Sequence, residues 1–259
     1  MNRIKGILFI TIISIAFISC EKETDERKTG NINTNPDTNF VGMYFAKQGT
    51  LRLAFNHTFG SSPLQLAPLT FVTAKMDTVA ITDLKYYISH VKLIREDNSI
   101  LNLQNNNLLD FITNKTEINL EVPAGKYKAV SFYLGVDSVN NSSGLQQGDL
   151  DPANGMFWTW STGYIYYRLK ARHGFDNKGI VYDIGGAQHL LSFTFDLSTY
   201  KVSKDIITVV INNNVAAVFN SPNQLVLDSV ENQVHSATNP IIPVLKQNIS
   251  SSITLKEVF

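Results

Sequence analysis

Cysteine is almost absent from this sequence, which has one, Cys20, among 259 residues. A disulfide framework needs cysteines in pairs, and thiolate sites for zinc or iron–sulfur clusters need several, so a single chain can form neither. The position of Cys20 near the N-terminus assigns it to export rather than to the folded domain. No other thiol is present to act as a catalytic nucleophile.

Charge is scarce as well. Charged residues make up 17% of the chain, whereas about 25% is usual for soluble proteins. The 22 basic residues balance 22 acidic residues, so no basic field indicates a nucleic-acid partner. Hydrophobic residues reach 44%, which excludes disorder of the whole chain, and 25 Asn and 20 Ser supply uncharged polarity. This composition is typical of an exported β protein.

Known catalytic signatures are missing too. The sequence has no Gly-x-Ser-x-Gly elbow, no Gly-x4-Gly-Lys phosphate loop and no His-Glu-x-x-His pair. We therefore expect no enzymatic activity. Two carboxylates that meet from distant positions stay open as an alternative, because such a pair leaves no local motif.

The N-terminus has the order of an export signal. Arg3 and Lys5 precede an apolar run over residues 7–17 that is too short to span a bilayer as a helix. Phe17-Ile18-Ser19-Cys20 then resembles a bacterial lipobox. We predict a lipoprotein signal peptide over residues 1–19 and a lipid anchor on Cys20, which holds the protein at the outer membrane, on its periplasmic or its outer face. An ordinary signal peptide is the alternative.

Two further regions follow the signal. Residues 20–40 are charged at first and then rich in Asn and Thr, without an apolar period, and so predict an acidic and polar tether. Residues 41–259 form the predicted domain. Within it, apolar and polar residues alternate over 51–59 and 191–197, and 206–211 is a β-branched run.

Turns divide the domain into many short strands. We expect further strands at 86–94, 126–136 and 164–171, and turns at 123–125, 176–179 and 212–214. Helices are expected to be short, at 214–219 or 237–247. The predicted fold class is therefore all-β, a single antiparallel β-sandwich domain.

The middle of the chain holds its most distinctive residues. Trp158 and Trp160 are one residue apart, so an extended segment places them on one side. Asp137, Asp149 and Asp151 lie in loops beside them and offer the oxygen ligands that calcium prefers. The alternative is structural, with the acids in Asx turns and the tryptophans at one end of the sandwich.

Six segments stand out by their order and spacing: Leu84-Lys-Tyr-Tyr-Ile-Ser89, Pro123-Ala-Gly-Lys-Tyr127, Gly135-Val-Asp137, Leu150-Asp-Pro152, Gly155-Met-Phe-Trp-Thr-Trp160 and Gly163-Tyr164. Together they resemble the MbnP-like domain family, named after a periplasmic protein of methanobactin operons, over residues 51–258. The resemblance implies an exported β-sandwich that binds copper. It also implies a partner, a dihaem cytochrome c peroxidase that oxidises a tryptophan of the copper protein. The members of this family include lipoproteins of Bacteroidetes. Trp158 and Trp160 are the candidates for that oxidation here.

Copper(I) favours imidazole and thioether ligands. His57 lies on the apolar face of its strand, where the resemblance also places a ligand-type histidine; a histidine satisfied inside the core is the alternative. His189 is in phase with Leu191 and is also expected to point inward. Met156 offers a thioether but lies among aromatics, where packing is the usual role.

The other histidines are weaker candidates. His90 is expected to share a strand face with Tyr86, Ile88 and Ile94, and it completes the predicted metal set of His57, His189 and His90. His173 and His235 lie in turn-like or polar stretches and are expected to be in solvent.

One position departs from the family. Asp183 stands where a matching family segment carries histidine, and a carboxylate is a poor ligand for copper(I). Either His189 takes over, or the chain has kept the fold and lost the site. Two hypotheses therefore stay open. One is a copper-binding envelope lipoprotein, and the other is a module that holds a glycan, peptide or protein on an aromatic-rich surface that includes Tyr164, Tyr166 and Tyr167.

Overall fold

The computed structural model describes residues 48–144, 146–159, 162–198 and 206–259. The predicted signal peptide, the predicted tether, Cys20 and Trp160 lie outside these ranges. The described residues belong to one compact unit that spans residues 45–259. Within the described ranges, no helix has the length and apolar character needed to cross a membrane.

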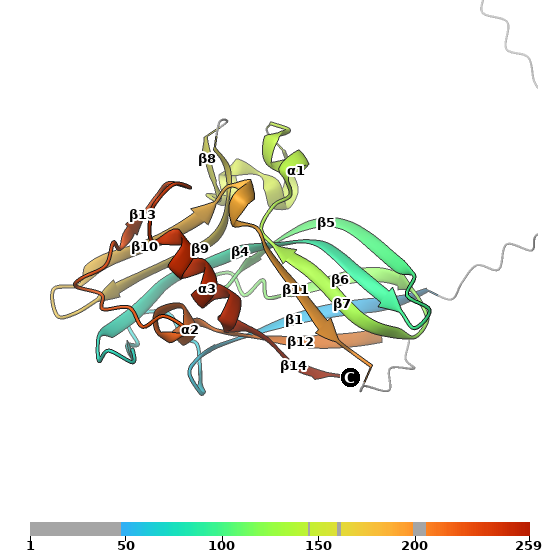
Figure 1. Ribbon diagram of the computed structural model, residues 1–259, viewed down its shortest axis with the longest axis horizontal. Coiled ribbons are helices and arrows are strands. Elements are labelled where there is room, and N and C mark those ends of the chain that lie inside the picture. The colour runs from blue at the N-terminus through green and yellow to red at the C-terminus, as the bar shows by residue number, and fades with distance from the viewer. Residues whose placement is uncertain (1–47, 145, 160–161, 199–205) are drawn as a thin grey trace, which may run out of the picture. The chain divides into compact units, whose positions relative to one another are not determined.

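Strands dominate this unit, and the prediction of an all-β fold with short helices is confirmed (Figure 1). The strands are β1 (Gln48–Phe59), β2 (Ser62–Pro63), β3 (Phe71–Val72), β4 (Thr78–Arg95), β5 (Ile100–Asp110), β6 (Glu117–Pro123), β7 (Tyr127–Leu134), β8 (Phe157–Thr159), β9 (Gly163–His173), β10 (Lys178–Gly185), β11 (Leu191–Asp196), β12 (Ile206–Asn214), β13 (Gln233–Val234) and β14 (Ile253–Val258). The helices are α1 (Ser138–Ser142), α2 (Val215–Asn220) and α3 (Ile242–Ser252), with single 3-10 turns η1 (Gly148–Leu150), η2 (Pro152–Asn154) and η3 (Ala187–His189).

The first sheet is centred on β1. Its order is β14-β12-β1-β2, and β6 also pairs with β1. The predicted period of two in β1 is confirmed, because Leu51, Leu53, Phe55, His57 and Phe59 are buried while the residues between them are half-buried. Since β1 pairs in parallel with β12 and antiparallel with β6 and β2, this sheet is mixed.

The three asparagines at 212–214, predicted as a turn, instead finish β12. Asn56 Nδ2 donates to Asn212 Oδ1 across the β1–β12 pair at 2.8 Å, so these two amide side chains are partners within the ladder. The side chain of Asn214 then accepts from Ala216 N and begins α2. The helix expected at 214–219 is thereby confirmed.

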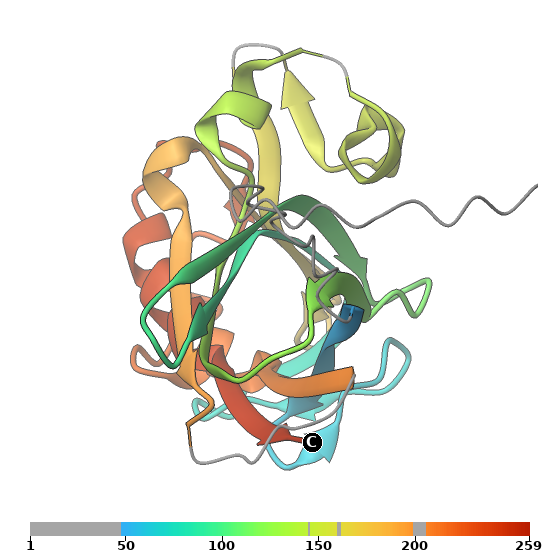
Figure 2. The same cartoon turned by 90° about the vertical axis from the view of Figure 1, so that its right-hand side faces the viewer.

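The second sheet is built along β4. Its order is β11-β7-β4-β9-β10-β13, with β3 and β5 also paired to β4 and β8 paired to β9. At 18 residues, β4 is long enough to pair with β9 in its first half and with β5 and β7 further along. Figure 2 shows the strands curving around a common interior. Both sheets contribute buried side chains to one hydrophobic core in that interior.

Helices α2 and α3 pack against each other beside the first sheet. Helix α3 corresponds to the helix expected at 237–247, but it begins at Ile242 rather than at residue 237. Two consecutive turns, closed by Asn239 N donating to Ser236 O and Ile242 N donating to Asn239 O, occupy the residues before it. Pro243 lies in the first turn of α3, where proline is compatible with a helix start.

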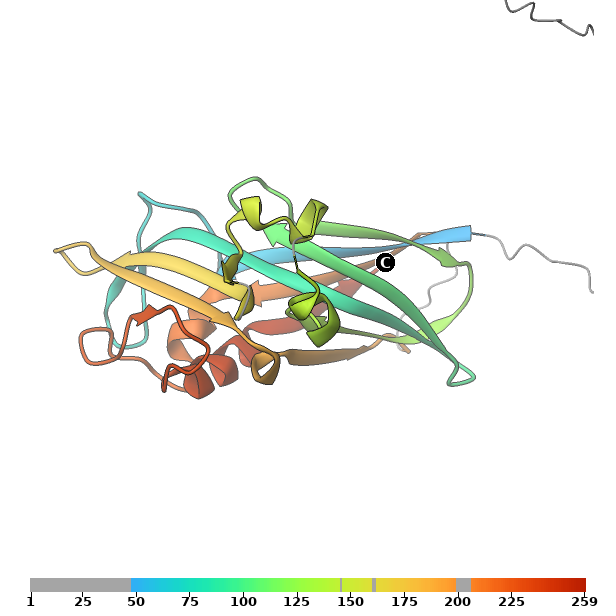
Figure 3. The same ribbon diagram turned by 90° about the horizontal axis from the view of Figure 1, so that it is seen from above.

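Between β7 and β9, residues 136–144, 146–159 and 162 form what we call the cap. The cap contains α1, η1, η2 and β8 and lies over the outer face of the second sheet (Figures 1 and 3). A second, smaller core fills the space below it. Its buried members are Tyr87, Leu108, Val136, Leu150, Met156, Tyr164, Ile165 and Tyr166. Tyrosine hydroxyls fix the cap to the sheet, since Tyr164 donates to Leu150 O at 2.6 Å and Tyr87 donates to Asp149 O at 2.9 Å.

The close approach of the cap to β10 generates a stability prediction. A Cβ atom added at Gly185 would overlap the backbone carbonyl of Tyr164 and lie 3.0 Å from the Trp158 ring. We expect Gly185→Ala to lower the free energy of unfolding by about 1–3 kcal/mol, because backbone has to move. Gly125→Ala is the control, since nothing lies within 4 Å of its added Cβ. Chemical denaturation of both variants tests this, and equal stabilities would contradict it.

Candidate functional site

A β-bulge in β4 turns His90 toward the cap. The registers of β4 with β5 and β7 shift between Ser89 and the residues that follow, and His90 has a φ of 50°. Tyr86 and Ile88 face the core before the bulge, and Val91 and Leu93 do so after it. The expectation that His90 shares a face with Tyr86 and Ile88 was therefore wrong, because one extra residue reverses the alternation.

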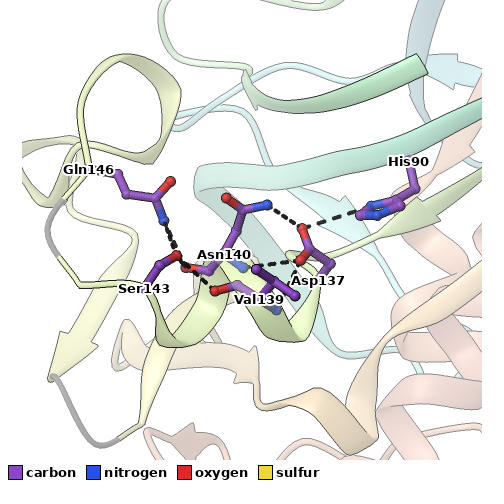
Figure 4. Close-up of polar contacts among 6 residues, drawn as sticks. All are labelled: His90, Asp137, Val139, Asn140, Ser143 and Gln146. Carbon is purple, nitrogen blue, oxygen red and sulfur yellow. Dashed lines mark hydrogen bonds and ion pairs between the residues drawn. The ribbon is translucent and has the colours of Figure 1, made fainter. Parts of the chain in front are cut away.

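His90 lines a polar cavity of about 510 Å³ between the sheet and the cap. The cavity wall consists of His90, Asn106, Asp137, Val139, Asn140, Gln146, Gln147, Asp149 and Leu150. Figure 4 shows His90 and Asp137 facing each other, with α1 and Gln146 on the cap side. His90 Nδ1 lies 3.8 Å from Asp137 Oδ2. The structure thus brings together three predicted site residues, His90, Asp137 and Asp149.

Asp137 begins α1 and keeps its charge. Its Oδ1 accepts from the backbone N–H groups of Val139 and Asn140, each at 3.0 Å, and its Oδ2 accepts from Asn140 Nδ2 at 2.6 Å. Desolvation opposes ionisation of Asp137, but these hydrogen bonds and the nearby His90 outweigh it and lower the pKa. Below the cavity, burial and the charge of Asp137 raise the pKa of Tyr166 to about 12.

The other two acidic residues have separate roles. Asp149 accepts from Leu108 N at 2.8 Å and pairs with Lys115, so it fastens η1 to β5. Asp151 accepts from Ala153 N at 2.8 Å, begins η2 and does not line the cavity. Calcium binding by the three aspartates stays a prediction, with Asp137 and Asp149 on one wall and Asp151 away from it.

His57 lies in the core between the two sheets, as its strand phase predicted. Its Nε2 is 2.9 Å from Tyr86 Oη, and its ring is 5.0 Å from the ring of Phe111. Burial lowers the pKa of His57 to about 4, against a smaller opposing effect of the Phe55 backbone. The imidazole is therefore neutral and already hydrogen-bonded, which fits the alternative of a satisfied core histidine.

The remaining histidines lie in three other surroundings. His189 ends η3 and is half-buried, with Nε2 2.7 Å from Ala237 O, so it does not continue the inward phase of β11 that we expected. His173, expected in solvent, is only 4% exposed because it pairs with Val79 at the start of β4. His235 is exposed, as expected. Among the described residues, no group of three or more His, Cys, Asp or Glu side chains is arranged to hold a metal.

Asp183, at the position where the resemblance expects histidine, forms a buried ion pair with Arg168. Arg168 Nε and Nη2 donate to its two carboxylate oxygens at 2.7 and 2.8 Å, and Arg168 Nη1 donates to Gly155 O at 2.7 Å. The Asp183 side chain is 5% exposed. Both oxygens of this carboxylate thus hold the guanidinium that binds the cap.

The aromatic residues of the middle segment are mostly internal. Tyr164, Tyr166 and Tyr167 are buried, so they do not form the aromatic-rich surface that we considered. Trp158 is half-buried against the small core under the cap, and Met156 is fully buried in that core, where it packs as expected. Trp160 lies outside the described residues.

The amide residues of the cavity were missed at the sequence level. Asn106 lies in the run Gln104-Asn-Asn-Asn107, and Gln146 and Gln147 form a pair in the cap. A cluster of amides inside a strand is unusual, because asparagine is depleted from strands. That cluster was the available signal for a polar surface on β5.

The burial of His57 generates a prediction on pH. Above pH 6.5 both folded and unfolded chains hold this residue neutral, whereas between 6.5 and about 4 only the unfolded chain is protonated. We expect this difference to remove about 3 kcal/mol of stability as the pH falls to about 4. Denaturant unfolding should show a weaker pH dependence in His57→Leu, and wild-type dependence in the control His235→Gln. If the stability of His57→Leu depended on pH as strongly as that of the wild type, the loss of stability at low pH would not come from His57.

Comparison with known proteins identifies the family. The model of the MbnP family matches residues 48–238. Among solved structures, the chain is similar to MbnP from Methylosinus trichosporium, with 13% identity, a TM-score of 0.49, and coverage of 67% of this chain and 78% of that one. No curated protein matches the sequence. Because the family model spans well over half of the chain, this protein belongs to the MbnP family.

Proposed function

We propose that this member of the MbnP family is an exported, lipid-anchored binding protein that holds a small polar ligand under its cap. The observation that carries the proposal is the convergence of His90, Asn106 and Asp137 on one cavity of about 510 Å³. That volume is within the range of about 300–1,000 Å³ that small-molecule sites occupy. The bulge brings His90 into this mostly polar wall, in which Val139 and Leu150 are the apolar members.

The anchor is the second part of the proposal and rests on the sequence. Residues 1–20 have the order of basic residues, apolar run and lipobox-like end. A lipid on Cys20 keeps the domain in the cell envelope, at the outer membrane, with residues 21–40 as a polar connection. No nucleic-acid partner is part of this proposal, since the charges balance.

Copper fits the described residues poorly. His57 is the one predicted ligand inside the sandwich, and its ring contacts Tyr86 and Phe111. These neighbouring groups are a phenol and a phenyl ring, which are not the soft ligands that copper(I) prefers. His90 and His189 face other surroundings, and Asp183 is held by Arg168. Copper binding, a dihaem peroxidase partner and oxidation of Trp158 or Trp160 therefore stay predictions of the resemblance, and we derive no step from them.

Ligand binding is tested by chemical-shift mapping on the isotope-labelled, full-length protein. Separate pools of amines, carboxylates, sugars and divalent cations are added, and we expect one pool to shift signals of Asn106, Asn140 and Gln147. A second polar hollow of about 510 Å³, lined by residues that include Asn56 and Asn212, is the internal control. Shifts confined to that hollow, or no shifts at the cap from any pool, would rule out the cap cavity as a ligand site.

The anchor is tested by detergent phase partitioning of the protein expressed in a bacterial envelope. We expect the wild type to enter the detergent phase and Cys20→Ser to stay in the aqueous phase, because the acyl chains are attached to the thiol. Ser19→Ala keeps a small residue before the cysteine and is the matched control. Wild-type partitioning of Cys20→Ser would show that the protein is not a lipoprotein.

A further inference from the structure

The cap cavity has buried polar atoms without hydrogen-bond partners. His90 Nδ1 and Asn106 Oδ1 are both buried in its wall and have no hydrogen-bond partner. Buried polar atoms without partners are rare in native proteins and call for an explanation, such as a bound ligand. Asp137 Oδ2, which lies 3.8 Å from His90 Nδ1, is an acceptor on the same wall that already accepts one hydrogen bond, from Asn140 Nδ2.

The charged residues of the cavity wall are mainly acidic. Of the described residues that line it, none is lysine or arginine. The charge of Asp149 is met by Lys115 from β5–β6, whereas the cationic group nearest to Asp137 in the wall is His90, which is charged only when protonated. The ionised Asp137 therefore places a negative charge in a partly desolvated wall that has no lysine or arginine among its described residues.

We propose that the ligand carries a primary ammonium group, which binds Asp137, His90 and Asn106. The inference rests on the proposed function, that the cavity is a ligand site. A primary ammonium has three donors and no acceptor. It can donate to Asp137 Oδ2, to Asn106 Oδ1, and to His90 Nδ1 in the neutral tautomer that carries its proton on Nε2, while its charge pairs with that of Asp137. An anion would be repelled by Asp137, and a neutral hydroxyl would leave that charge unpaired.

A metal cation fits the same wall less well. A divalent cation needs several ligand oxygens at once. The oxygens of Asp137 already accept three hydrogen bonds from α1, which leaves room on Oδ2 for one N–H donor, and those of Asp149 hold Leu108 N and Lys115. No group of three His, Cys, Asp or Glu side chains that could hold a metal is found among the described residues. Divalent cations are therefore an outcome of the test rather than the expected ligand.

Titrations followed by chemical shift on the full-length protein test the inference. The probes are pentylamine, its neutral counterpart 1-pentanol, calcium chloride, and Nα-acetyl-lysine amide, which presents the same group as a peptide side chain. Asp137→Asn removes the charge but keeps the start of α1, because asparagine is as good as aspartate at that position. Asp151→Asn is the matched control, since Asp151 begins η2 in the same way and lies outside the cavity wall.

We expect pentylamine to bind the wild type and Asp151→Asn with equal affinity, and Asp137→Asn about tenfold or more weakly. Tighter binding of the lysine amide than of pentylamine would identify a peptide side chain as the source of the ammonium. Equal binding of 1-pentanol, tighter binding of calcium, or an unchanged affinity in Asp137→Asn would overturn the inference. If the amines fail but another pool maps to the cap, only this inference is wrong; if no pool maps there, the proposed function is wrong as well.

Discussion

The constraint on which the structure depends is that the second sheet buries aromatic side chains on both faces. Along β4 and β9 the tyrosines alternate, with Tyr86 and Tyr167 in the main core and Tyr87, Tyr164 and Tyr166 outside it. Strand geometry sends neighbours to opposite faces, so these pairs cannot share one core. A second layer has to cover the outer face, and the cap supplies it. The polar cavity exists because that layer covers the sheet incompletely.

The fold was largely predictable because its strands obey simple alternation. Residues 51–59 were assigned correctly to an inward and an outward set, including His57. The alternation failed at His90, where one extra residue in β4 changes the phase, and a bulge leaves no clear mark in a single sequence. The parallel pairing of β1 with β12 was equally hidden, because the residues of β12 follow those of β1 by about 150 positions and no local pattern connects them.

The candidate site was predictable only in its parts. Asp137, Asp149 and Asp151 were grouped because they lie in loops beside the tryptophans, and the first two line one cavity. His90 and Asn106 come from strands that only the tertiary fold brings beneath the cap. The role of Asp183 was also hidden in the sequence. As a departure from the family it indicated a lost ligand, and its partner Arg168 was recognisable only once β9 and β10 were paired. A buried carboxylate needs such a partner, since the uncompensated charge would cost several kcal/mol.

The Arg168–Asp183 pair also connects the site to the scaffold. Arg168 reaches from β9 to Asp183 on β10 and to the carbonyl of Gly155 in the cap. The same cap residues that this pair helps to place lead into β8, where Trp158 packs against Gly185. Arg168 and the hydroxyls of Tyr87 and Tyr164 therefore hold the η1–η2 part of the cap. The α1 part is attached to β9, because Asn141 Oδ1 accepts from Tyr164 N at 2.8 Å. Asp137 and His90 are thus held in position before a ligand arrives, which lowers the entropic cost of binding.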